Sequence, residues 1–137
     1  MLSELESKPT STSVLPPELL LEVFDEPIMF HRCYVALTGS VTAALVLSYA
    51  SYATEELADL DAGEHDGWVV KTDAEWQHDT GLTRTELEIA RRKLKAQGLW
   101  EERRQGPPPA PLQYRINQTA LFEQLRAQAL AHWGDRT

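Results

Sequence analysis

Residues 71–100 read KTDAEWQHDTGLTRTELEIARRKLKAQGLW and contain two helix starts eleven residues apart. Each start is an S/T-x-x-E capping box, formed by Thr72 with Glu75 and by Thr83 with Glu86. In such a box the hydroxyl accepts one free backbone N–H of the first turn, and the carboxylate accepts another. Two helices with well-defined beginnings are therefore predicted in this stretch.

These two helices are predicted to differ in length. The first extends over residues 73–79 and is stopped by Gly81, whereas the second extends over residues 84–97 and ends at Gly98. Glycine is favoured just after a helix because it adopts the left-handed conformation without steric cost. A short helix, a tight turn and a longer helix thus form a bihelical unit over residues 72–98.

A hairpin and a final helix are predicted after the bihelical unit. The hairpin, or wing, covers residues 99–116, with strands over residues 99–103 and 112–116 and the proline-rich tip QGPPPAP between them. Asn117 is a suitable cap for a helix over residues 117–133. The apolar residues of that helix recur at helical spacing: Leu121, Phe122, Leu125, Ala129 and Trp133.

The N-terminal part of the chain gives weaker signals. Residues 1–15 are rich in Ser, Thr and Glu without a hydrophobic period, which indicates a flexible tail. A short helix over residues 18–24 follows two prolines, and the apolar run at residues 27–31 predicts a strand. A brief helix over residues 32–37, closed by Gly39, comes next.

A central helix and a short strand complete the predicted elements. Ser40 is a good N-cap for a helix over residues 41–56, whose apolar side chains lie nearly all round it and indicate a buried position. An acidic connector over residues 55–66 then leads to a strand over residues 67–71. The predicted fold is mainly α with a small β-sheet (α+β), in one domain over residues 16–137.

Length and composition favour an ordinary globular protein. The chain has 137 residues, of which 42% are hydrophobic and 25% charged. Cys33 is the single cysteine, which excludes an intrachain disulfide framework and indicates a reducing, cytoplasmic compartment. The longest apolar stretch, residues 41–53, is shorter than the roughly 20 residues of a membrane helix, and the N-terminus lacks an apolar signal region. No membrane partner is expected.

The charge is distributed unevenly along the chain. The net charge is −8, which on its own argues against binding to nucleic acid. Residues 1–82 hold 3 basic and 15 acidic residues, net −12, whereas residues 83–137 hold 10 basic and 6 acidic residues, net +4. Such asymmetry indicates that one face contacts a polyanion, although it also arises when charges merely solvate the surface.

Two stretches resemble the winged-helix DNA-binding domains of phage and plasmid replication proteins and related phage regulators. They are PIMFHRCYVALTGSVTAALVLSYASY and DGWVVKTDAEWQHDTGLTRTELEIARRKLKAQGLWEERRQGPPPAPLQYRIN, which cover about residues 27–117. The most specific pieces are GWVVKTDAEW, TGLTRTELEIARRKLKAQGL and LQYRIN. The resemblance implies a winged helix-turn-helix with an added N-terminal segment and a C-terminal helix.

The resemblance makes residues 84–97 the recognition helix. At about 100° per residue, one side of this helix carries Leu87, Ala90 and Leu94. The other side carries Thr85, Glu88, Ile89, Arg92 and Lys95, with Arg84 and Arg91 on a flank. Two further arginines lie at the root of the wing. The DNA-binding residues so implied are Arg84, Thr85, Glu88, Arg91, Arg92, Lys95, Arg103 and Arg104.

These basic residues also have a plain structural interpretation. Arginine and lysine near the end of the recognition helix complement its dipole and solvate an exposed face. Glu101 and Glu102 directly precede the arginines of the wing and weaken its positive charge. The single cysteine is expected to be buried, and three tryptophans are expected in the core: Trp68, Trp76 and Trp100.

No motif supports catalysis. The chain contains none of GxSxG, GxxxxGK[ST], HExxH or GxGxxG, and its four histidines lack metal-ligand spacing. A non-enzymatic protein without cofactor or metal is therefore predicted. Its expected partner is double-stranded DNA in replication or transcriptional control, with a homodimer formed through the C-terminal helix. The alternative is an acidic winged-helix adaptor that binds a protein such as a polymerase or replisome subunit.

Overall fold

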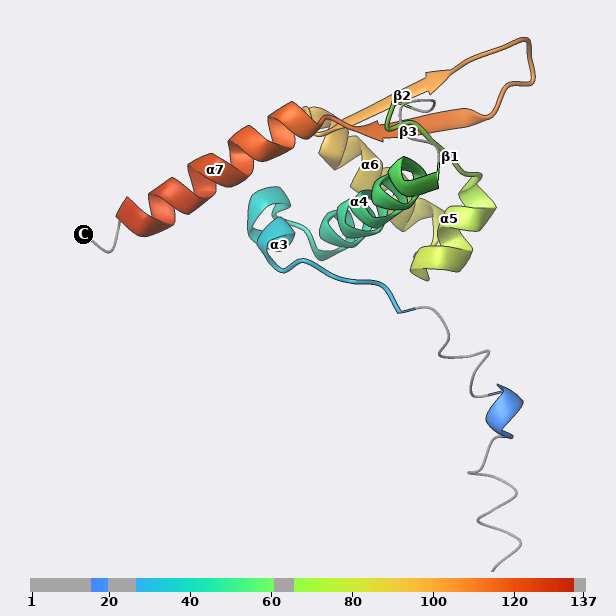
Figure 1. Ribbon diagram of the computed structural model, residues 1–137, viewed down its shortest axis with the longest axis horizontal. Coiled ribbons are helices and arrows are strands. Elements are labelled where there is room, and N and C mark those ends of the chain that lie inside the picture. The colour runs from blue at the N-terminus through green and yellow to red at the C-terminus, as the bar shows by residue number, and fades with distance from the viewer. Residues whose placement is uncertain (1–15, 20–26, 61–65, 135–137) are drawn as a thin grey trace, which may run out of the picture.

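The computed structural model describes residues 16–19, 27–60 and 66–134 (Figure 1). The predicted tail over residues 1–15 and most of the predicted helix over residues 18–24 lie outside them. The prediction of a mainly helical α+β protein is confirmed. The elements are α3 (Cys33–Thr38), α4 (Val41–Leu60), β1 (Val69–Val70), α5 (Asp73–Thr80), α6 (Arg84–Ala96), β2 (Trp100–Arg104), β3 (Leu112–Ile116) and α7 (Gln118–Gly134).

Both predicted capping boxes are present at the starts of α5 and α6. The Glu75 N–H donates to Thr72 Oγ1 at 3.1 Å, and the Thr72 N–H donates back to the Glu75 carboxylate at 3.2 Å. Thr83 and Glu86 repeat this exchange at 3.2 and 3.0 Å. These backbone hydrogen bonds lower the pKa of both glutamates. The two helix starts are thus closed by the chain's own carboxylates.

The end of α6 determines where the first strand of the wing begins. The Leu99 N–H donates to the Leu94 carbonyl at 3.0 Å, and the N–H of Gly98 (φ 74°) donates to the Lys95 carbonyl at 2.9 Å. This pair of bonds is a Schellman cap. Because Leu99 belongs to the cap, the strand begins one residue later than predicted, at Trp100.

The three strands form an antiparallel sheet in the order β1-β3-β2. Trp100 lies opposite Ile116, and Glu102 opposite Tyr114, so the wing is a regular hairpin. Val69 pairs with Tyr114 on the other edge of β3. The predicted strand over residues 67–71 is shorter than expected, with two residues in β1. In Figure 1 the hairpin extends well beyond the helices.

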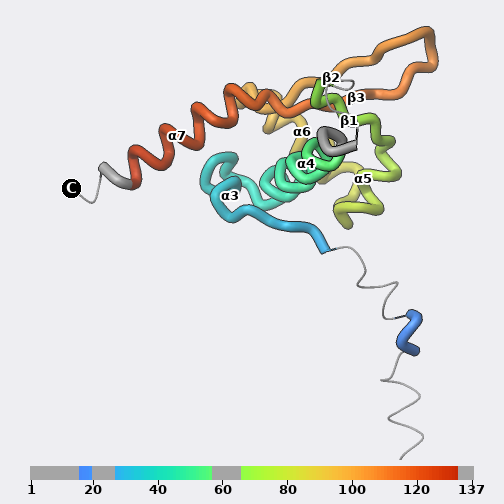
Figure 2. The backbone as a smooth tube through the Cα atoms, viewed as in Figure 1, coloured from blue at the N-terminus to red at the C-terminus, as the bar shows by residue number. Residues whose placement is uncertain are grey.

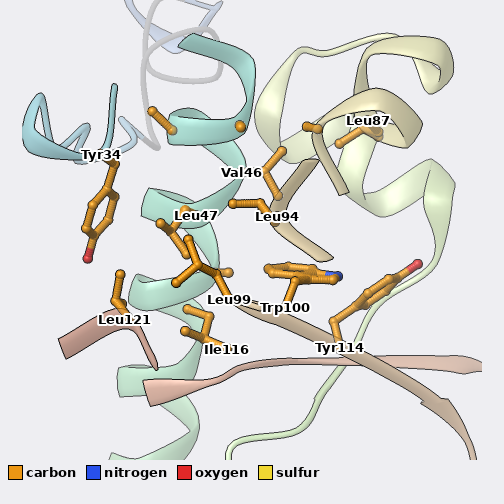
Figure 3. Close-up of a cluster of buried hydrophobic side chains, with 14 of the residues drawn as sticks. Tyr34, Val46, Leu47, Leu87, Leu94, Leu99, Trp100, Tyr114, Ile116 and Leu121 are labelled. Carbon is orange, nitrogen blue, oxygen red and sulfur yellow. The ribbon is translucent and has the colours of Figure 1, made fainter. Parts of the chain in front are cut away.

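The core lies between α4, α6 and one face of the sheet (Figure 3). Trp76 and Trp100 belong to this core as predicted, whereas Trp68 is buried outside it, beneath Arg103 and Arg115. Trp76 is 1% exposed and meets Tyr49, Trp100 and Tyr114 edge-on, with ring centroids 5.4–6.0 Å apart. The indole N–H groups of Trp76 and Trp100 have no hydrogen-bond acceptor among the described residues. Apolar and ring contacts therefore hold this cluster together.

Three predictions for the N-terminal half are corrected. The predicted strand at residues 27–31 is wrong: the segment is irregular, and its His31 N–H donates to Ser48 Oγ of α4 at 3.1 Å instead of to a strand. Helix α4 begins as predicted but continues to Leu60. Cys33 is exposed, not buried. Because α3 has only six residues, its buried side is taken by Tyr34 and Thr38, one turn apart.

Helix α7 leaves the body of the molecule (Figures 1 and 2). Asn117 caps it as predicted, with Oδ1 accepting from the Ala120 N–H at 3.1 Å. Its first turns pack beside α3, where Leu121 is buried. Phe122 and Leu130 are 66% and 61% exposed. Among the described helices, none is long and apolar enough to cross a membrane.

Hydrogen bonds among three polar side chains connect α5 to α4 and to the residue after β1. Asp79 accepts hydrogen bonds from Lys71 Nζ and from the Tyr49 hydroxyl, the latter at 2.8 Å. Burial alone would raise the pKa of Asp79, but these hydrogen bonds together with that of His78 lower it to about 2, from an ordinary value of 3.8. The ionised carboxylate therefore stabilises the folded state.

This depressed pKa predicts a specific loss of stability in acid. A carboxylate with a lowered folded pKa stabilises the protein above its unfolded pKa and loses that contribution as the pH falls from about 4 to about 2. Asp79→Asn should cost on the order of 1 kcal/mol near neutral pH and less below pH 3. Urea denaturation of both proteins at several pH values measures the difference. A constant difference down to pH 2 would contradict this assignment.

Candidate nucleic-acid interface

Helix α6 presents one side to solvent, as its sequence pattern predicts. Leu87, Ala90 and Leu94 are at most 1% exposed and form the buried side. Thr85 and Arg92 lie on the opposite side and are exposed. The exposed side chains are Arg84, Thr85, Glu88, Ile89, Arg92, Lys93, Lys95 and Ala96. Since the capping box and the Schellman cap define both of its ends, this surface lies on a well-anchored helix.

Arg91 lies inside a network and not on the exposed face. Its side chain is 12% exposed, and its guanidinium is 3.1 Å from the Asp73 carboxylate and 3.6 Å from that of Glu102. It also lies over the Tyr114 ring, 5.4 Å from the centroid. Burial, helped by the two carboxylates, raises the pKa of Tyr114 to about 12 although Arg91 opposes this. Arg91 thus ties α6 to α5 and β2.

Two more of the predicted basic residues have acidic partners. Lys95 Nζ lies 2.7 Å from the Glu102 carboxylate, and Arg84 Nε lies 3.4 Å from that of Glu88, one turn away. The second pair is weak, since Arg84 is 72% exposed and water competes for both groups. Of the six basic residues predicted to bind DNA, Arg91 and Lys95 are therefore neutralised within the fold, and Arg84 is only weakly paired.

The charge of three predicted contacts is not balanced by a carboxylate among the described residues: Arg92, Arg103 and Arg104. None of the three pairs with a carboxylate in the part of the chain that the structure describes. Arg103 donates from Nε to Gln113 Oε1 at 2.6 Å, and Arg104 donates to the Ala110 carbonyl at 2.7 Å. The free positive charge thus lies on the outward side of α6 and on both faces of β2, with Arg104 on the face that Glu102 shares and Arg103 on the other.

The starts of α5 and α6 do not offer an anion site. A free helix N-terminus binds phosphate through its unpaired N–H groups. Here each capping box already takes two N–H groups, those of Thr72 and Glu75 in one box and those of Thr83 and Glu86 in the other, and the glutamates place a negative charge at both helix starts. A phosphate ligand would have to be held by side chains of α6 and the wing.

Comparisons with known proteins give no guide to these residues. Protein-family models, curated sequences and solved structures yield no match to the chain. The case for a function therefore depends on the geometry of α6 and the wing.

Three further residues lie beside the predicted contacts: Ile89, which the helical spacing places on the outward side of α6, and Trp68 and Gln113, whose contacts with Arg103 the sequence pattern did not predict. Ile89 is an apolar side chain that is 54% exposed between Thr85 and Arg92. Trp68 lies under the Arg103 guanidinium, whose Cζ is 4.0 Å from the ring centroid. Gln113 Oε1 accepts a hydrogen bond from the Nε–H of Arg103. Arg103 and Gln113 are directly opposed in the hairpin, so pairing the two strands in register would have revealed that contact.

Proposed function

We propose that this protein is a cytoplasmic, non-enzymatic winged-helix protein that binds double-stranded DNA in replication or transcriptional control of a phage or plasmid. The observation that supports it best is a set of arginines, on one exposed helix and the adjoining hairpin, that pair with no carboxylate of residues 16–19, 27–60 or 66–134: Arg92, Arg103 and Arg104. Arginine binds phosphate and guanine edges through paired N–H donors.

In this proposal α6 enters the major groove. Thr85 and Arg92 face the base edges, and Arg84 is recruited to DNA because its ion pair with Glu88 is exposed and weak. The wing arginines hold the sugar-phosphate backbone. Arg91 and Lys95 keep their partners on α5 and β2 and act by positioning α6. Titration of a fluorescently labelled duplex with the full chain tests the proposal, which requires saturable binding at low salt.

The ion pairs around Glu102 support a second candidate function. They neutralise part of the positive face, and Ile89 gives it an exposed apolar centre, as expected of an adaptor that binds a protein. The N-terminal half of the chain is strongly acidic, which favours the same function.

Deletion of residues 1–26 separates the two functions. It removes six acidic residues and one basic residue and changes the net charge from −8 to −3. For a DNA-binding protein the deletion should raise duplex affinity, most strongly at low salt where screening is weakest. For an adaptor it should leave DNA binding negligible. Anisotropy titrations of the full and the shortened chain at two ionic strengths measure the change. If the two proteins bind with equal affinity at both ionic strengths, residues 1–26 do not repel DNA electrostatically.

The exposed side of α7 supports the proposed homodimer. Phe122 and Leu130 are large apolar side chains that α7 leaves exposed, and a second copy of the same helix would cover both. Light scattering at high micromolar concentration should give twice the chain mass of 15.5 kDa. Phe122→Glu with Leu130→Glu should restore the single-chain mass. A single-chain mass for the unaltered protein would contradict the dimer.

A further inference from the structure

The outer face of the sheet carries two arginines on one tryptophan. Trp68 is 7% exposed, and its ring centroid lies 4.0 Å from Arg103 Cζ and 4.4 Å from Arg115 Cζ. Side chains alternate along a strand, so this face is the one opposite the buried Trp100 and Tyr114. Both guanidinium groups are held by cation–π contact.

The two arginines differ in their acidic partners. Arg115 donates to both carboxylate oxygens of Glu101, at 3.2 and 3.4 Å, and to the Asp66 carboxylate at 3.1 Å. Arg103 meets a neutral amide instead, that of Gln113. The strand register places Glu101 opposite Arg115 and Gln113 opposite Arg103. One arginine of the pair is thus neutralised and the other keeps its full charge.

The contacts of Arg103 leave one edge of its guanidinium for a ligand. The Trp68 ring covers one face and Gln113 accepts from Nε, so the two terminal amino groups have no hydrogen-bond partner among the residues that the structure describes. That edge matches two oxygens of a phosphate, and a guanidinium already fixed in direction loses little entropy on binding.

We propose that Trp68 and Gln113 are positioning residues that hold Arg103 ready to bind a phosphodiester of the DNA backbone. This inference rests on the proposed DNA binding and names the two residues that orient the Arg103 side chain on the wing. Gln113 serves because it is uncharged: a carboxylate at the same place would pair with Arg103 as Glu101 pairs with Arg115.

The test replaces Gln113 by glutamate in the full chain. Gln113→Glu should lower the affinity for a labelled 20-base-pair duplex about tenfold, because Arg103 becomes paired. The control is Gln105→Glu, the same charge change at an exposed position of the wing, with an expected loss under about threefold. Urea denaturation should show that both variants fold, since the new carboxylate in Gln113→Glu gains a partner.

A second comparison distinguishes positioning from a general structural role. Trp68→Leu should weaken binding in the unaltered chain but have no further effect when Arg103 is already alanine. Equal losses for the two glutamate variants, or additive effects of the Trp68 and Arg103 changes, would overturn the inference while leaving the proposed function intact. An unaltered chain that does not bind duplex DNA would instead overturn both.

Discussion

Replacing Arg92 and Arg104 by alanine together is expected to lower duplex affinity about a hundredfold at low salt. Both side chains are exposed, and neither pairs with a carboxylate in the described part of the chain. A hydrogen bond to a charged group contributes about 1.5–3 kcal/mol, and each 1.4 kcal/mol corresponds to about a tenfold change in affinity. Anisotropy titration of the same duplex with both proteins measures the loss.

A matched double variant controls for net charge. Arg32→Ala with Arg126→Ala also removes two exposed arginines, but from the start of α3 and from α7. Both double variants have a net charge of −10, compared with −8 for the unaltered chain. The control should lose less than about threefold, because distant exposed charges are screened. Equal losses in the two variants would show that overall charge, and not this surface, determines binding.

Trp76→Ala is expected to have the largest effect on folding. Its ring is 1% exposed and is surrounded by Tyr49, Trp100 and Tyr114. Removing a buried tryptophan costs about 3–5 kcal/mol, a large part of the roughly 5–15 kcal/mol that holds a typical domain folded. The urea midpoint should therefore fall steeply. Ile89→Ala, at an exposed position, should change the stability by less than about 0.5 kcal/mol.

The outcome of this comparison tests the described core directly. If Trp76→Ala and Ile89→Ala unfold at the same urea concentration, Trp76 does not lie at the centre of the hydrophobic cluster. If the Trp76 variant is too unstable to purify, Trp76→Phe keeps much of the ring and should show a smaller loss in the same direction.

Local signals in the sequence were enough to predict the bihelical unit. The capping boxes and terminal glycines act within a few residues, so the bounds of α5 and α6 are close to those predicted. The segment at residues 27–31 was mispredicted because its backbone contact is with Ser48, seventeen residues away from His31. The exposure of Cys33 also follows from packing, since Tyr34 and Thr38 take the buried side of α3.

The candidate site was predictable in its residue types but not in its pairing. Helical periodicity places Thr85 and Arg92 on the outward side of α6, and the structure agrees. Arg91 is not available on the exposed side of α6, because it pairs with Glu102 of β2. Ion pairs between separate elements depend on how those elements pack, which the spacing along one helix does not reveal.

The salt dependence of duplex binding tests the central proposal most directly. Neutralising each phosphate releases counterions, so the logarithm of the affinity falls linearly with the logarithm of the salt concentration, with a slope of about −0.9 per contact. With Arg84, Arg92, Arg103 and Arg104 available, the proposal predicts a slope of about −3 to −4 for the full chain between 50 and 200 mM salt. Absence of binding at 50 mM salt, or a slope near zero, would contradict it.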